Sequence, residues 1–107
     1  MQSIRLKNIK YDEMLVLQKF LEAGVLAGKT DIDDPEFCCV MAVIAELYIK
    51  IMKKTLFVDK SKILSLKLTA AQGYSILAYI DRADEIINHF SQIVIVDFRN
   101  NIHKQLI

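Results

Sequence analysis

Apolar residues dominate the middle of the chain, from Asp34 to Phe57. Nine consecutive apolar residues fill positions 37–45, and seven of the next twelve positions are apolar as well. A helix that is apolar nearly all round is typical of a protein core. Asp34, Pro35 and Glu36 suit its first turn, where an acceptor side chain, a missing amide proton and a negative charge are all favourable. The pattern predicts a central helix that is buried on most of its circumference, with one narrow exposed stripe: Glu46, Lys50, Lys53 and Lys54.

Two short segments alternate between apolar and polar residues, which is the period of a half-buried strand. In residues 3–7, isoleucine and leucine alternate with arginine and lysine, and in residues 63–68 leucine occupies every second position. The alternation predicts that these segments form a small two-stranded ribbon. If its apolar side faces the core, the basic residues share the outer face: Arg5, Lys7 and Lys67.

Helical periodicity predicts three further helices. The first starts near Asp12 and ends at the stop signal Gly28. The second begins after Thr69, because Thr69 and Gln72 have the spacing of a capping box. A break near residues 81–84 separates it from the last helix.

The last helix carries one apolar stripe, formed by Ile87, Phe90, Val94, Phe98 and Ile102. Four β-branched residues stand together at 93–96, and such a run also fits a strand. The helical period on both sides favours a helix over Gln92–Phe98, with a strand as the alternative. In a helix, Ile95 and Val96 lie off the stripe, so we expect them to form a self-association surface.

Length and composition place the chain in one class of fold. A chain of 107 residues fits one domain, here residues 1–107. We therefore expect an all-α, or mainly α, compact bundle of about four helices, with the ribbon as a small addition. A weak similarity at an offset of 60 residues leaves open that the order strand, helix, helix occurs twice. Because 53% of the residues are hydrophobic, above the usual share, we expect a homodimer.

Enzyme signatures are absent from the sequence, so we expect no catalytic residue, no cofactor and no metal site. The adjacent Cys38 and Cys39 point about 100° apart on a helix, which makes them poor disulfide partners. We interpret them as buried, reduced thiols in a cytoplasmic protein. No secretion signal opens the chain, and charged residues interrupt the longest apolar run, so we expect no membrane partner.

Charge is distributed unevenly along a chain whose net charge is +1. Residues 1–10 and 50–67 together hold nine basic residues and one acidic residue, which leaves a net charge of −7 for the rest. This arrangement indicates a candidate basic patch: Arg5, Lys7, Lys53, Lys54, Lys60, Lys62 and Lys67. The sequence favours an interaction or assembly module that acts as a homo-oligomer, binding itself or another protein. The alternative is a small nucleic-acid-binding protein that uses the basic patch.

Overall fold

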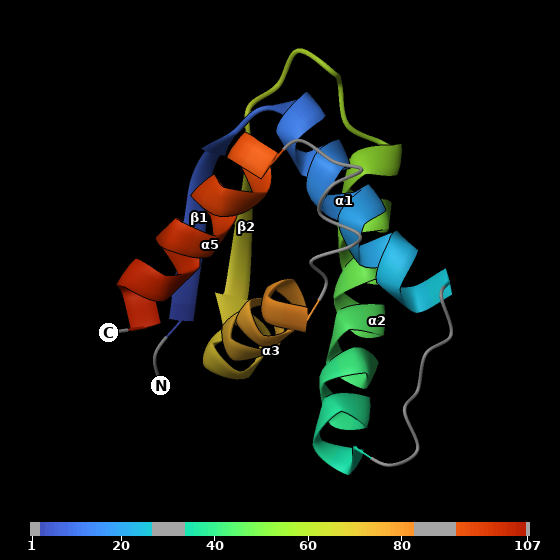
Figure 1. The fold of residues 1–107 in the computed structure, drawn as a ribbon. Coiled ribbons are helices and arrows are strands. Elements are labelled where there is room, and N and C mark those ends of the chain that lie inside the picture. The colour runs from blue at the N-terminus through green and yellow to red at the C-terminus, as the bar shows by residue number, and fades with distance from the viewer. Residues whose placement is uncertain (1–2, 27–33, 83–91, 107) are drawn as a thin grey trace.

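The computed structural model describes residues 3–26, 34–82 and 92–106. Two strands and four helices follow one another in the described residues (Figure 1): β1 Ser3–Ile9, α1 Tyr11–Leu26, α2 Pro35–Leu56, β2 Leu64–Thr69, α3 Ala70–Arg82 and α5 Gln92–Leu106. The predicted helical bundle with a small ribbon is confirmed. Within the described residues, the order strand, helix, helix occurs twice, as the internal similarity suggested, although a common origin of the two halves stays a hypothesis.

The two strands form an antiparallel ribbon with one buried face. Leu6 lies opposite Leu66, and one extra residue then bulges out of β1 before Ile9 pairs with Leu64. Asn8 takes a φ of 60° in this bulge, a conformation that asparagine tolerates better than most residues. The bulge returns Ile9 to the buried face, which is completed by Ile4, Leu6, Leu64, Leu66 and Leu68.

Side chains from two helices cover both edges of the ribbon. The Gln105 side chain accepts a hydrogen bond from the Arg5 amide (2.8 Å) and donates one to the Arg5 carbonyl (2.9 Å). On the other edge, the Lys50 ammonium donates to the Lys67 carbonyl at 2.7 Å. Because exposed strand edges invite pairing with other chains, these contacts close the ribbon against aggregation.

The helices bury the inner face of the ribbon and build one hydrophobic core. The predicted core residues Leu17, Leu21, Ile44, Leu47 and Ile51 are fully buried within it, whereas Leu77 is only partly buried against it.

Packing between α1 and α3 is close enough to require a glycine. The rings of Phe20 and Tyr79 are 4.8 Å apart, and the Tyr79 hydroxyl donates to the Phe20 carbonyl at 2.6 Å. A Cβ atom at Gly24 would overlap the Tyr79 hydroxyl. Gly73 has a similar role on the other side of α3, where a Cβ atom would overlap Ile4 of β1. Gly73 therefore allows α3 to pack closely against both the ribbon and α5.

Both predicted helix starts have the expected hydrogen bonds. Asp34 accepts from the Phe37 amide at 3.2 Å, and Thr69 and Gln72 exchange two hydrogen bonds as a capping box. Arg82, at the end of α3, binds the Asp34 carboxylate at 2.5 Å and stacks on Phe37 with its guanidinium carbon 4.6 Å from the ring centre. The bond from Arg82 and the amide of Phe37 lower the pKa of Asp34.

The prediction that α2 is buried on most of its circumference is wrong. Its fully buried residues form one face, Ile44, Leu47, Ile51 and Thr55, while the residues before them are partly buried or exposed. A helix of 22 residues is about 33 Å long, longer than the roughly 23 Å of a seven-residue strand. The start of α2 therefore extends beyond α3 and the ribbon (Figure 1).

The last helix resolves the choice between helix and strand, because residues 92–106 are helical throughout. The predicted break near residues 81–84 falls at the edge of residues 83–91, which lie outside the described residues. Gly28, Ile87 and Phe90 lie outside the described residues.

We predict that Ile44→Ala lowers the free energy of unfolding by about 2 to 5 kcal/mol, since it opens a cavity in the core. The control is Ile49→Ala on the exposed side of the same helix, which should cost less than about 0.5 kcal/mol. Urea unfolding followed by circular dichroism measures both. Equal losses in the two variants would contradict the assignment of the buried face.

A second prediction concerns alkaline pH. Burial raises the pKa of Tyr79 to about 12. In the unfolded chain the pKa of this tyrosine is about 10. The contribution of neutral Tyr79 to the free energy of unfolding is therefore fully present below about pH 10 and decreases as the pH rises toward 12. Tyr79→Phe removes this loss, so the stability gap between parent and variant should shrink by about 1.4 kcal/mol between about pH 9 and pH 11. Urea unfolding at the two pH values measures the gap, and a constant gap would mean that Tyr79 is not shielded from solvent.

Candidate functional site

Two basic regions that are distant in the sequence meet at one end of the molecule. Lys10, between β1 and α1, lines an open pocket of about 340 Å³ together with Lys60 and Lys62 from the loop between α2 and β2. That loop lies at the extreme end of the molecule (Figure 1), and the last turn of α2 leads into it. We call the exposed lysines of these segments the basic end: Lys10, Lys53, Lys54, Lys60 and Lys62.

Hydrogen bonds fix the backbone at both sides of this pocket. The Asp59 carboxylate accepts from the Ser61 amide at 3.0 Å, and the Asp59 carbonyl accepts from the Lys62 amide at 3.0 Å. Bonds from the Ser61 amide and then the Ser61 hydroxyl lower the pKa of Asp59. Across the pocket, the Lys10 amide donates to the Glu13 carboxylate at 3.0 Å. The lysines therefore extend from ordered turns.

Large apolar side chains are exposed within the same loop and the helix turn before it. Phe57 is 92% exposed, Ile63 is 68% exposed and Leu56 is 63% exposed. The sequence pattern placed Leu56 and Phe57 in the central helix and missed their exposure. The available signal was their position between Lys54 and the polar segment 59–62, where a helix ends and its buried face ends with it.

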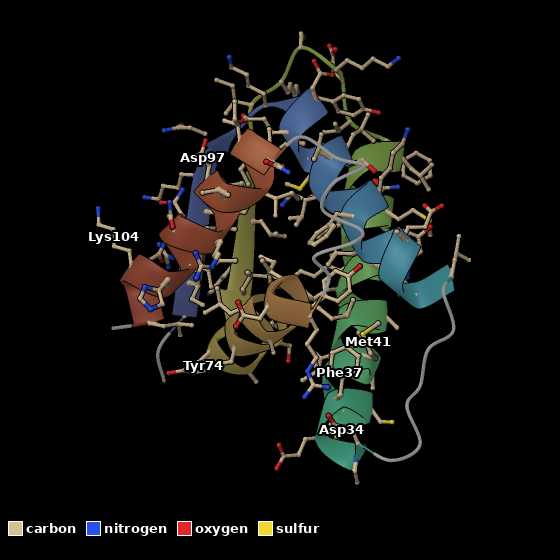
Figure 2. All side chains as sticks on the ribbon, in the orientation of Figure 1. Asp34, Phe37, Met41, Tyr74, Asp97 and Lys104 are labelled. Atoms are coloured by element: carbon tan, nitrogen blue, oxygen red, sulfur yellow. The ribbon has the colours of Figure 1, made fainter. Side chains whose placement is uncertain are left out.

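The structure divides the rest of the predicted basic patch. Arg5 and Lys67 are direct partners across the exposed outer face of the ribbon, as expected. Lys7 instead lines a second pocket of about 310 Å³, where Glu13 and Asp97 balance the charge of two lysines. Figure 2 shows Asp97 and Lys104, the other lysine of this pocket, on α5. Of the predicted patch, the structure brings Lys60 and Lys62 to one pocket, together with Lys10, which the prediction did not include.

The predicted self-association surface is corrected at one of its two residues. Ile95 is 1% exposed and belongs to the core of the same chain, because α5 turns Ile95, Phe98 and Ile102 inward. Val96 is exposed at 45%, and the neighbouring exposed residue is Ile93, at 76%. The inward face of α5 is thus rotated from the predicted stripe, and Val94 is only partly buried.

A metal site is not evident in the residues that the structure describes. No group of three or more His, Cys, Asp or Glu side chains could hold a metal ion there, and His103 is exposed. Every buried side-chain nitrogen or oxygen in this part of the chain has a hydrogen-bond partner. Three of the four tyrosines lie in different surroundings: Tyr48 donates to Glu22, Tyr74 is exposed and Tyr79 is buried. Within the described ranges, no helix is long and apolar enough to cross a membrane.

No family model, curated protein or solved structure matches this chain.

The two cysteines depart from the prediction of buried thiols, since Cys39 is exposed and Cys38 is half-buried. They lie in the part of α2 that extends past the core, which explains the difference.

We predict that a thiol reagent labels the Cys38→Ser variant, which keeps Cys39, quickly in the native state and labels the Cys39→Ser variant more slowly. Mass spectrometry over time measures both rates. Slow labelling of Cys39 at the rate of the half-buried thiol would show that another surface covers it.

Proposed function

We propose that this protein is a binding module that attaches to phosphate-bearing polyanions through its basic end. The observation that carries the proposal is the meeting of Lys10 with Lys60 and Lys62 around one pocket. Lysine is a flexible point charge that binds phosphate without demanding one geometry. The chemistry fits recognition of a charged surface better than recognition of one small molecule.

The local charge balance supports attraction of anions. Residues 10–13 and 53–63 hold five lysines, two aspartates and one glutamate, so this end carries a net charge of +2 on a chain whose total is +1. One of the two aspartates, Asp59, uses its carboxylate to hold the turn. Exposed charges act over about 8 to 10 Å at physiological salt, which is enough for neighbouring lysines to act together.

We predict that the protein binds a chain of inorganic polyphosphate at low salt and that the affinity falls as salt rises. Charge reversal by Lys60→Glu and Lys62→Glu together should weaken binding and make the salt dependence shallower by about 0.7 for each phosphate that the variant no longer neutralises. The control is Lys104→Glu. Lys104 is exposed and lies toward the end of α5 that is far from the loop (Figure 2), so this variant should bind like the parent. Calorimetric titration measures binding, and circular dichroism checks the fold.

Absence of binding at low salt would contradict the proposal, because low salt exaggerates electrostatic attraction. An equal loss in the Lys104→Glu control would contradict the location of the site.

A second candidate function is self-association through α5. Ile93 and Val96 are three residues apart on a helix and therefore share a face, and both are exposed. Exposed apolar patches on proteins often mark interfaces, and a twofold dimer is the commonest arrangement. The dimer that we propose uses Ile93 with Val96 in place of the buried Ile95.

We predict that Ile93→Glu and Val96→Glu together convert a dimer to a monomer while the fold is kept, because neither side chain is buried in the chain itself. Sedimentation equilibrium at micromolar concentration measures the mass of parent and variant. Ile49→Glu, at an exposed apolar residue of α2, is the control and should leave the mass unchanged. A parent protein that sediments as a monomer would contradict this second candidate.

A further inference from the structure

Three exposed apolar side chains lie among the lysines of the basic end, and we call them the apolar tip: Leu56, Phe57 and Ile63. Ile63 lines the same pocket as Lys10, Lys60 and Lys62. Phe57 follows the last residue of α2 directly and caps that helix, so its position is set by a regular element. An exposed apolar group within a cationic rim is an unfavourable surface in water unless something covers it.

We propose that the basic end docks on a phospholipid surface that contains anionic lipids, with the apolar tip inserted at the boundary between headgroups and acyl chains. The inference rests on the proposed function, because the same lysines would contact the lipid phosphates. Lysine and exposed Phe, Leu and Ile side chains are the usual composition of interfacial membrane anchors. Long lysine side chains reach the headgroups while apolar neighbours enter the acyl region.

The composition of the apolar tip favours a lipid surface over a nucleic acid. Single-stranded nucleic acids are held by stacking of bases on aromatic rings and on arginine. The segments of the basic end contain two aromatic residues, the exposed Phe57 and the half-buried Tyr11, and no arginine. The other two members of the tip, Leu56 and Ile63, are aliphatic and offer no ring for stacking. Aliphatic side chains gain from transfer out of water, which an acyl layer provides.

The position of the tip in the fold also permits docking. The loop between α2 and β2 projects at one end of the molecule, beside the last turn of α2, so this end can approach a flat surface (Figure 1). This proposal departs from the expectation that no membrane partner exists. That expectation considered spanning helices, and a surface contact needs none.

A fluorescent reporter tests the insertion. The chain contains no tryptophan, so Phe57→Trp introduces a single fluorophore at the tip. We expect its emission to shift to shorter wavelength when vesicles of phosphatidylcholine with about one-third phosphatidylserine are added, since anionic lipid attracts the lysines. Vesicles of phosphatidylcholine alone should give no shift. Tyr74→Trp is the matched control, because Tyr74 is an exposed aromatic residue on α3, away from the loop (Figure 2), and its emission should not change.

Vesicle sedimentation measures the contribution of the tip to binding. Phe57→Ala should weaken binding to the anionic vesicles about tenfold, as expected for one buried aromatic side chain, and Tyr74→Ala should not. Because Phe57 is almost fully exposed in the free protein, its loss should leave the thermal melt unchanged.

The outcomes separate this inference from the proposed function. Vesicle binding that needs Phe57 supports both. Polyphosphate binding without vesicle binding, or vesicle binding that Phe57→Ala leaves unchanged, overturns the lipid inference and leaves the proposed function standing. Binding of a single-stranded oligodeoxythymidylate that needs Phe57, in the absence of vesicle binding, also overturns the lipid inference in favour of a nucleic acid. Failure to bind polyphosphate and vesicles alike overturns both.

Discussion

The buried face of the two-stranded ribbon is the constraint on which the structure depends. A two-stranded ribbon is marginally stable by itself, so its apolar side chains have to be covered by other elements. The helices supply that cover from one side, and Gln105 and Lys50 close the two strand edges. The outer face of the ribbon, with Arg5 opposite Lys67, is left to solvent. Its polar character follows from the alternation of the strands, so one pattern determines both the core and an outer surface.

The same arrangement determines what the loop between α2 and β2 can do. Because α2 is longer than the strands and β2 returns along the ribbon, the loop has to turn at the end of the molecule (Figure 1). Asp59 stabilises this turn through hydrogen bonds to the backbone, and Lys60 and Lys62 extend from it. Lys10 reaches the same place since β1 ends beside the start of β2. A cationic end with apolar residues is thus a consequence of ribbon register and helix length.

The sequence was sufficient for elements whose signals are local. Alternation identified both strands, and the side chains of Asp34, Thr69 and Gln72 marked two helix starts, since capping depends on neighbours within three residues. Burial around a helix was less predictable, because periodicity gives the spacing of an apolar face and does not say how the helix is turned toward its neighbours. Ile95 was placed outside the core for this reason. The exposure of Phe57 was missed because the apolar pattern continues past Lys54, whereas the buried face of α2 ends at Thr55. For the candidate site, the uneven charge indicated the lysines, while the meeting of Lys10 with Lys60 and Lys62 required the strand register.

Amide chemical-shift mapping can show whether anions bind at the basic end. A nitrogen-labelled sample is titrated with inorganic polyphosphate at low salt, and the shift of each backbone amide is followed. We expect the largest shifts on residues 10–12 and 53–63, with small shifts in α3 and α5. Shifts centred on the outer face of the ribbon or on α5, or no shifts at all, would contradict this expectation.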